Sequence, residues 1–279
     1  MSVGPPAARE IAPAKLNLSL HVRSKLPDGR HGIETVFAFC TDGDLLSARP
    51  RPESFGLLVS GPFAQELDPD DPGDNKPNLI LQAARQLQKA VGRTDGAQFE
   101  LDKNLPVASG LGGGSADAAA ALRLLTSMWG SDPTKAETVA PTLGSDVPAC
   151  LLSLPMRGEG AGNQLTPIDL SDVSGTPVLL VNPRVPLSTA EVFAAWDGMD
   201  RGPLGDWRDG RNDLEASATA LVPQIGDVLT WLSAQRGATF TRMSGSGATC
   251  FAFFDSEPSR DAAADAVPQE WWRLATFLR

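Results

Sequence analysis

Apolar and polar residues alternate along residues 11–22, IAPAKLNLSLHV. From Ala14 onward the apolar residues occupy every second position, and Lys15 and Asn17 occupy positions between them. Successive side chains of a strand point to opposite faces, so this pattern predicts a half-buried strand. Lys15 and Asn17 are therefore expected on one polar face.

Similar patterns predict further elements. Apolar spacing of three to four residues indicates helices over residues 78–91 and 118–129, the second ending at Gly130. A helix, a strand, the turn 244–247, a strand and a final helix are expected in the last part of the chain. Strands are expected at residues 33–40, 44–48, 55–60, 98–102, 177–181 and 248–254.

A glycine-rich, polar stretch over residues 158–175 is the best candidate for a domain boundary. We therefore expect an N-terminal domain over residues 1–163 and a C-terminal domain over residues 164–279. Residues 196–212 contain many glycines and aspartates and predict a long surface loop. Asn212 or Asp213 would cap the helix that follows.

Four glycines lie within five residues in the stretch SGLGGGSADAAAALRLL, which begins at Ser109. Glycines before a helix allow backbone N–H groups to approach a phosphate closely, and the helix dipole favours the anion. Ser115 offers a hydroxyl or a helix cap. The spacing fits neither the Walker A loop nor the dinucleotide-binding motif. A tightly packed turn before a buried helix remains the alternative.

Two other stretches allow a structural or a chemical interpretation. Asp146 precedes the apolar run 147–154, where it is either a turn former at a strand entrance or a general base. A nearby Lys15 would keep its carboxylate ionised, but the sequence alone does not bring the two together. Residues 244–249, SGSGAT, fit a hairpin turn or a second glycine loop.

Composition excludes several classes of protein. The 279 residues include 24 basic and 34 acidic residues, for a net charge of -10, and no basic stripe, so nucleic acid is not an expected partner. No apolar run reaches membrane-spanning length, and we expect a cytoplasmic protein without membrane contact. Three distant cysteines and two histidines make a zinc site improbable.

Several motifs in order along the chain resemble the GHMP kinases. Residues 106–115 match the family's PxxxGLGxxS phosphate loop at every fixed position. Ordered motifs over nearly the whole chain are much more specific than one glycine loop. Besides the phosphate loop, the matching motifs are PAKLNL from Pro13, PDGRH from Pro27, NL at Asn78, LGSDVP from Leu143 and MSGSGA from Met243.

The resemblance implies an α+β fold of two domains, the first like ribosomal-protein-S5 domain 2 and the second ferredoxin-like, with the active site in the cleft between them. It also implies ATP and Mg²⁺ as cofactors and a small-molecule substrate. The PDGxH and LGSDVP motifs imply transfer of the γ-phosphoryl group to the 2-hydroxyl of 4-diphosphocytidyl-2-C-methyl-D-erythritol, in the non-mevalonate isoprenoid pathway. A monomer and a weak homodimer are both open.

Carried over by residue, the resemblance makes Asp146 the base that accepts the substrate proton and Lys15 the cation beside it. Asn78 and Lys103 would lie around the nucleotide, and Ser115 would reach the Mg²⁺ ion. The phosphates would be held by Pro106, Val107, Ala108, Ser109, Gly110, Leu111, Gly112, Gly113, Gly114, Ser115 and Ala116. The substrate would be held by Asn17, His31 and Phe193.

This chain departs from the family pattern at three positions. Arg30 replaces a common tyrosine, and its guanidinium could stack on cytosine opposite Phe193. Ala116 replaces a frequent second serine, and Asn163 a frequent glutamate. The alternatives are a homoserine or mevalonate kinase-like enzyme, a nucleotide-binding module that has lost catalysis, or an RNA-binding protein. The net charge disfavours the last of these.

Overall fold

The computed structural model describes residues 8–67 and 78–279. The chain forms two compact units, each assembled from several segments. Unit 1 takes the described parts of residues 1–14, 43–107 and 113–152, and unit 2 takes residues 15–42, 108–112 and 153–279. Strands β1 (Ala8–Lys25) and β2 (His31–Arg51) therefore contribute to both units. The predicted family-domain boundary between residues 163 and 164 stays a prediction.

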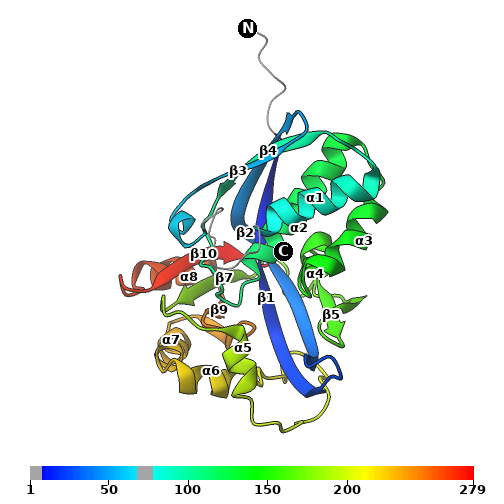
Figure 1. Ribbon diagram of the computed structural model, residues 1–279. Coiled ribbons are helices and arrows are strands. Elements are labelled where there is room, and N and C mark those ends of the chain that lie inside the picture. The colour runs from blue at the N-terminus through cyan, green and yellow to red at the C-terminus, as the bar shows by residue number, and fades with distance from the viewer. Residues whose placement is uncertain (1–7, 68–77) are drawn as a thin grey trace. The chain divides into compact units, whose positions relative to one another are not determined.

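Unit 1 combines a sheet with helices. Strand β4 (Gly96–Asp102) pairs in parallel with β3 (Phe55–Ser60) and antiparallel with the second half of β2. Helix α2 (Gly113–Trp129) packs beside α1 (Leu79–Val91), as Figure 1 shows. Because α2 buries many alanines, its neighbours can approach its backbone closely. The remaining helices are the short η1 (Ala64–Glu66), α3 (Pro133–Leu143) and α4 (Val147–Leu152).

Sequence signals set the ends of α1. The Asn78 side chain accepts a hydrogen bond from the Ile80 N–H at 2.9 Å, which caps the helix. At the other end Gly92 adopts a left-handed conformation with φ 67°. The buried residues Ile80, Ala83, Ala84 and Leu87 have the predicted helical spacing and form one face.

Unit 2 contains the hairpin of β5 (Met156–Glu159) and β6 (Gln164–Pro167), which pairs with the first half of β2. A separate antiparallel sheet has the order β10-β7-β9-β8. Its elements follow in the order of a ferredoxin-like fold, strand, helices, two strands, helix and strand. They are β7 (Pro177–Asn182), α5 (Thr189–Ala194), α6 (Glu215–Leu221), α7 (Gln224–Ser233), β8 (Ala238–Met243), β9 (Cys250–Phe254), α8 (Glu257–Asp265) and β10 (Trp272–Phe277).

Strand β9 is buried along its whole length, which explains its unbroken apolar sequence. Cys250, Ala252 and Phe254 join the hydrophobic core that α6, α7 and α8 help to build. The intervening Phe251 and Phe253 belong to an aromatic cluster. Both faces of this strand are therefore packed.

Most predicted elements are present, with differences that have physical reasons. Residues 33–40 and 44–48 belong to one long strand, β2. Helix α2 begins at Gly113 rather than Ala118, because glycines can be helical when packing supports them. The short apolar run after Asp146 begins as helix α4 and not as a strand, an ambiguity that short apolar runs always carry.

Two further expectations in unit 2 were incomplete or wrong. Leu214 is the N-cap of α6, so neither Asn212 nor Asp213 has the predicted capping position. The C-terminal helix α8 is followed by strand β10, which the sequence pattern had not indicated. None of the helices in the described ranges has both the length and the apolar character to cross a membrane.

Candidate active site

The glycine-rich loop leads into the first turn of α2, and its glycines serve different purposes. Gly110 and Gly112 have positive φ angles of 79° and 65°, which glycine adopts at little cost. A Cβ on Gly110 would lie 2.3 Å from the carbonyl oxygen of Ser244, so a side chain is also excluded sterically. Gly110 is thus required by backbone conformation and by packing.

The next two glycines lie in α2 itself. A Cβ on Gly113 would lie 3.0 Å from the Lys103 Nζ, whereas one on Gly114 would lie no closer than 3.7 Å to Leu79 Cδ1. Gly114 is exposed, and Ser115 lies within the first helical turn instead of capping it. The first backbone N–H groups of a helix lack partners within the helix. This end of α2 therefore has the chemical character of an anion site.

Three consecutive carbonyl groups of the loop accept hydrogen bonds within unit 2. The acceptors are Ser109, Gly110 and Leu111. A carbonyl oxygen would repel a phosphate, and these bonds direct all three oxygens toward protein donors. Their donors are the Thr249 N–H at 3.1 Å, the Ser244 hydroxyl at 2.9 Å and the Lys15 N–H at 2.9 Å, respectively.

Lys15 and Asn17 lie on the same face of β1, as the alternation predicts. Both are buried, so β1 is buried on both faces here and is not the half-buried strand that the pattern predicts. The Lys15 ammonium donates to Asn17 Oδ1 at 2.7 Å. Asn17 Nδ2 donates to the Thr35 hydroxyl at 2.7 Å, and that hydroxyl donates to the Ser19 carbonyl at 2.6 Å. The Asn17 N–H also donates to Ser244 Oγ at 3.2 Å. Hydrogen bonds therefore connect the predicted catalytic lysine to Asn17, which is predicted to bind the substrate.

Lys103 is buried in unit 1 between two carboxylates. Its ammonium donates to Asp44 Oδ2 at 2.5 Å and to Asp117 Oδ2 at 2.7 Å. Asp44 Oδ1 accepts the backbone N–H groups of Asn104 and Leu105. The cluster of Lys103, Asp44 and Asp117, called the ion triad below, therefore links β2, the end of β4 and helix α2.

Burial and charge oppose each other in the ion triad. Burial alone would lower the pKa of Lys103, but the charges of Asp117 and Asp44 outweigh it and raise that pKa. Burial raises the pKa of Asp117 to about 7, against the attraction of Lys103. The predicted location of Lys103 around the nucleotide stays a prediction. Its side chain has the two carboxylates as partners.

Asp146 and Asn78 both lie at the beginnings of helices in unit 1. Asp146 precedes α4, and its carbonyl accepts the Cys150 N–H at 2.9 Å. Asn78 uses its side-chain oxygen to cap α1. Asp146 is partly exposed, as a group that receives a proton from a substrate must be. Its pairing with Lys15, which belongs to unit 2, stays a prediction.

Two of the substrate-binding residues predicted in unit 2, His31 and Phe193, belong to a cluster of aromatic rings. His31 stacks on Phe193 with 4.9 Å between ring centroids, and its other neighbour is the edge-on Trp196 at 5.7 Å. Arg30 is exposed and pairs with Asp28 at 2.7 Å. Burial, followed by the charge of Lys25, lowers the pKa of His31, so the neutral imidazole is favoured.

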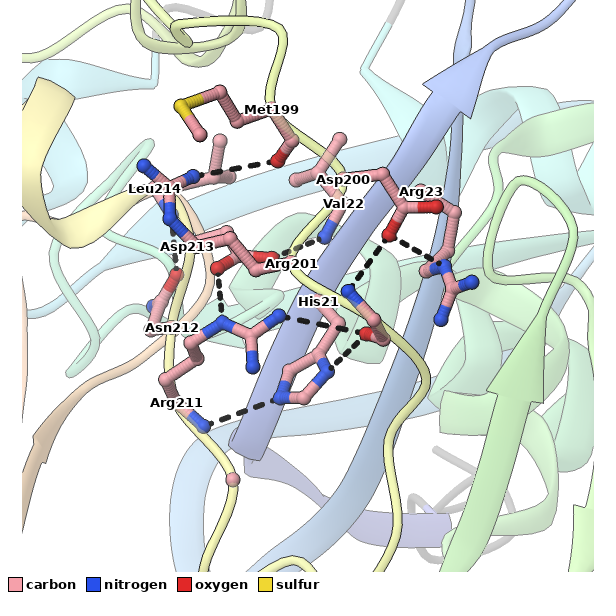
Figure 2. Close-up of polar contacts among 12 residues, drawn as sticks. His21, Val22, Arg23, Met199, Asp200, Arg201, Arg211, Asn212, Asp213 and Leu214 are labelled. Atoms are coloured by element: carbon pink, nitrogen blue, oxygen red, sulfur yellow. Dashed lines mark hydrogen bonds and ion pairs between the residues drawn. The ribbon is translucent and has the colours of Figure 1, made fainter.

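A second histidine fixes the long loop after α5 to strand β1 (Figure 2). His21 Nδ1 lies 3.1 Å from the Gly202 carbonyl, to which it can only donate. Its Nε2 accepts the Arg211 N–H at 3.3 Å. Burial, together with the charge of Arg211, lowers the pKa of His21. The neutral imidazole therefore matches both partners.

The residue after Arg211 connects this loop to the turn between β8 and β9. Asn212 Nδ2 donates to the carbonyl oxygens of Met243 and Gly245, each at 2.8 Å. Its Oδ1 accepts the Leu214 N–H at 3.0 Å. Residues 244–249 form a hairpin connection, one of the two interpretations that the sequence allowed, and the same segment contacts the glycine loop at Gly110.

Sequence patterns alone did not single out Thr35, Asp44, Asp117 or Trp196. The sequence offers two weak signals for these residues: the alternation in β2 and the position of Asp117 shortly after the glycine loop. Neither signal identifies a hydrogen-bond partner. Buried polar residues need partners, but the sequence does not say which ones they find.

Comparisons with known proteins agree with this architecture. The family model for the N-terminal domain of GHMP kinases matches residues 78–153, and the model for the C-terminal domain matches residues 198–273. The chain belongs to the GHMP kinases, a family of ATP-dependent phosphotransferases that act on small molecules.

Within that family, the chain is similar to 4-diphosphocytidyl-2-C-methyl-D-erythritol kinases. It is 52% identical to the one from Rhizorhabdus wittichii, over 97% of this chain and 94% of that protein. It is 49% identical to the one from Novosphingobium aromaticivorans, over 97% of this chain and 93% of that protein.

Solved structures give the same result for the fold. A crystal structure of 4-(cytidine 5'-diphospho)-2C-methyl-D-erythritol kinase matches with a TM-score of 0.83 and 29% identity, covering 97% of this chain and 99% of that chain. Homoserine kinase from Cytophaga hutchinsonii matches with a TM-score of 0.69 and 15% identity, over 100% of this chain and 96% of that chain. The second match concerns the fold alone.

Proposed function

We propose that this protein transfers the γ-phosphoryl group of ATP to the 2-hydroxyl of 4-diphosphocytidyl-2-C-methyl-D-erythritol, giving the 2-phosphate and ADP. The similarity to named kinases of this substrate, at 52% and 49% identity over nearly the full length, carries the proposal. The reaction belongs to the non-mevalonate route to isoprenoid precursors.

Phosphoryl transfer requires alignment of the reactants and stabilisation of charge more than it requires covalent chemistry. Asp146 accepts the proton of the attacking hydroxyl, and its partial exposure is compatible with contact to substrate. Lys15 compensates negative charge on the transferred group. The hydrogen bond from Lys15 to Asn17 supports a fixed position of the ammonium.

Residues 106–116 receive the phosphates of ATP in this proposal. The positive φ angles of Gly110 and Gly112, the exposed Gly114 and the start of α2 support that role. Asn78 and Lys103 lie around the nucleotide in this proposal. Ser115 is partly exposed, and its hydroxyl would help to hold Mg²⁺, a cation that prefers oxygen ligands and would offset the negative charge of the phosphates.

The cytidine and erythritol parts of the substrate are bound by unit 2. His31 and Phe193 supply stacked rings, and the favoured neutral imidazole can both donate and accept a hydrogen bond. Asn17 adds an amide close to Lys15. Arg30, held by Asp28, lies on the turn before His31 and adds a positive charge for the diphosphate or a plane for the base.

ADP release by the purified protein tests this function. Mg-ATP is supplied alone and with 4-diphosphocytidyl-2-C-methyl-D-erythritol, homoserine or mevalonate. Turnover with the cytidyl substrate only is expected. Turnover with another alcohol would keep the family chemistry and overturn the proposed substrate. ATP binding without turnover of any of them would favour a nucleotide-binding module.

Two accompanying properties are proposed and have separate tests. We propose that the protein works in the cytoplasm, which cell fractionation tests. We also propose a monomer or weak homodimer, which sedimentation at several concentrations distinguishes.

A further inference from the structure

We infer that Thr35 is a positioning residue for the kinase reaction, because its hydroxyl holds the Asn17 amide with the amide oxygen facing the Lys15 ammonium. This inference rests on the proposed function of Lys15. The geometry is a directed series of hydrogen bonds from the Ser19 carbonyl through Thr35 and Asn17 to Lys15, called the Thr35 relay below.

The direction of each bond in the Thr35 relay follows from the groups present. The Ser19 carbonyl can only accept, so the single proton of the Thr35 hydroxyl, 2.6 Å away, is donated to it. The hydroxyl oxygen must then accept from its other partner at 2.7 Å, and Asn17 Nδ2 is the end of the amide that can donate. Asn17 Oδ1 is thereby directed to the Lys15 ammonium.

The reverse orientation of the amide would place an NH₂ group against an ammonium. In that contact two donors face each other, and the partly positive amide hydrogens meet the positively charged ammonium. The charge-assisted bond of 2.7 Å would be lost. Thr35 and Asn17 have exposed fractions of only 0% and 2%, so little water competes for these bonds. The relay therefore selects one amide orientation.

Asn17 is also held through its backbone. Its N–H donates to Ser244 Oγ at 3.2 Å, and Ser244 donates to the Gly110 carbonyl at 2.9 Å. The backbone position of Asn17 thus depends on the glycine loop, whereas the orientation of its side chain depends on Thr35. A defect in Thr35 should disturb the ammonium more than the loop.

The test compares Thr35→Val with Thr35→Ser. Valine keeps the shape and removes the hydroxyl, while serine keeps the hydroxyl and removes a methyl group. For Thr35→Val we expect kcat to fall by about 10- to 100-fold, the range for losing the charge-assisted hydrogen bond between Asn17 Oδ1 and the Lys15 ammonium, with both KM values within about twofold. Thr35→Ser should restore most of that kcat.

Thr276→Val is the matched structural control. Thr276 is also fully buried in unit 2, and its hydroxyl donates to Asp42 Oδ2 at 2.7 Å, outside the relay. A general effect of losing a buried hydroxyl would lower kcat equally in Thr35→Val and Thr276→Val, and it would overturn the inference. Equal kcat in wild type and folded Thr35→Val would also overturn it.

A spectroscopic measurement separates this inference from the proposed function. The ¹H–¹⁵N signal of the Lys15 ammonium, assigned with Lys15→Arg, is recorded for the wild type and the Thr35 variants. Loss or broadening in Thr35→Val and recovery in Thr35→Ser is expected even if another alcohol is the substrate. An unchanged signal in Thr35→Val would contradict the relay, whereas an inactive wild type with the expected signals would overturn the proposed function alone.

Discussion

The hydroxyl of Ser244 donates a hydrogen bond of 2.9 Å to the carbonyl oxygen of Gly110. These residues belong to two glycine-containing loops that are far apart in the sequence. A Cβ on Gly110 would lie 2.3 Å from the Ser244 carbonyl oxygen, so the two backbones meet without room for a side chain. The shape of the glycine-rich loop is consequently fixed at Gly110 by the turn between β8 and β9.

Gly110→Ala should disrupt the loop, because alanine is strained at φ 79° and has no space. We expect the KM for ATP to rise at least about tenfold and the protein to lose about 1–3 kcal/mol of stability. Steady-state kinetics and urea unfolding measure the two effects. A variant with wild-type KM and stability would contradict the close packing.

Gly114→Ala, at the start of α2, is the informative counterpart. Gly114 is exposed and helical, and a Cβ there meets nothing closer than 3.7 Å. Alanine should therefore stabilise unit 1 by about 0.5–1 kcal/mol. If the phosphates approach this backbone, ATP affinity should fall in the same variant. Unchanged ATP binding, measured by calorimetry, would exclude Gly114 from the phosphate site.

Asp146→Asn should nearly abolish phosphoryl transfer while it leaves most ATP binding intact. The amide keeps the size of the carboxylate but does not accept a proton, and a positioned general base contributes about 10²- to 10⁴-fold to the rate. Rapid-quench kinetics measures phosphoryl transfer, and calorimetry measures ATP binding. Turnover equal to that of the wild type would show that another group serves as the base.

Lys103→Met should strongly destabilise unit 1, because it leaves Asp44 and Asp117 buried without their cation. Breaking a buried ion pair by removing one partner costs about 3–5 kcal/mol. The measurement is the free energy of unfolding in urea. Lys89→Met, on the exposed side of α1, is the control and should change that free energy by less than about 0.5 kcal/mol.

Stability should also depend on the protonation of His21, whose pKa is lowered in the folded protein by burial and by Arg211. The unfolded chain then binds the proton more readily than the folded protein. The stabilisation from neutral His21 is therefore complete above the unfolded pKa of about 6.5, and it is lost as pH falls toward the lower folded pKa. His21→Gln removes the titrating group and keeps a donor and an acceptor. Its urea midpoint should decline less than that of the wild type between about pH 7 and pH 5. Parallel declines would contradict the assignment.

The sequence predicted local features well where one periodic signal dominated. The alternation in β1 correctly placed Lys15 and Asn17 on one face, and Asn78 correctly marked the beginning of α1. The start of α2 was misjudged because glycine has a poor intrinsic helix propensity, yet Gly113 and Gly114 are helical in the fold.

Long-range partners could not be predicted in the same way. Asn212 was expected to cap a helix, but its amide binds two carbonyl oxygens of the turn after β8. The Thr35 hydroxyl and the ion triad likewise depend on which buried polar groups the fold brings together. Resemblance to a family supplies site residues by analogy, whereas the contacts themselves require coordinates.

The ring cluster around His31 gives the protein a built-in optical signal. The chain has six tryptophans and no tyrosine, so its near-ultraviolet emission comes almost entirely from indoles. Trp196 lies edge-on to His31, which stacks on Phe193. A pyrimidine that contacts these rings changes the surroundings of that indole. Fluorescence titration, with Trp196→Phe as the silent reference, therefore tests without a label and without turnover whether a nucleobase binds at these rings.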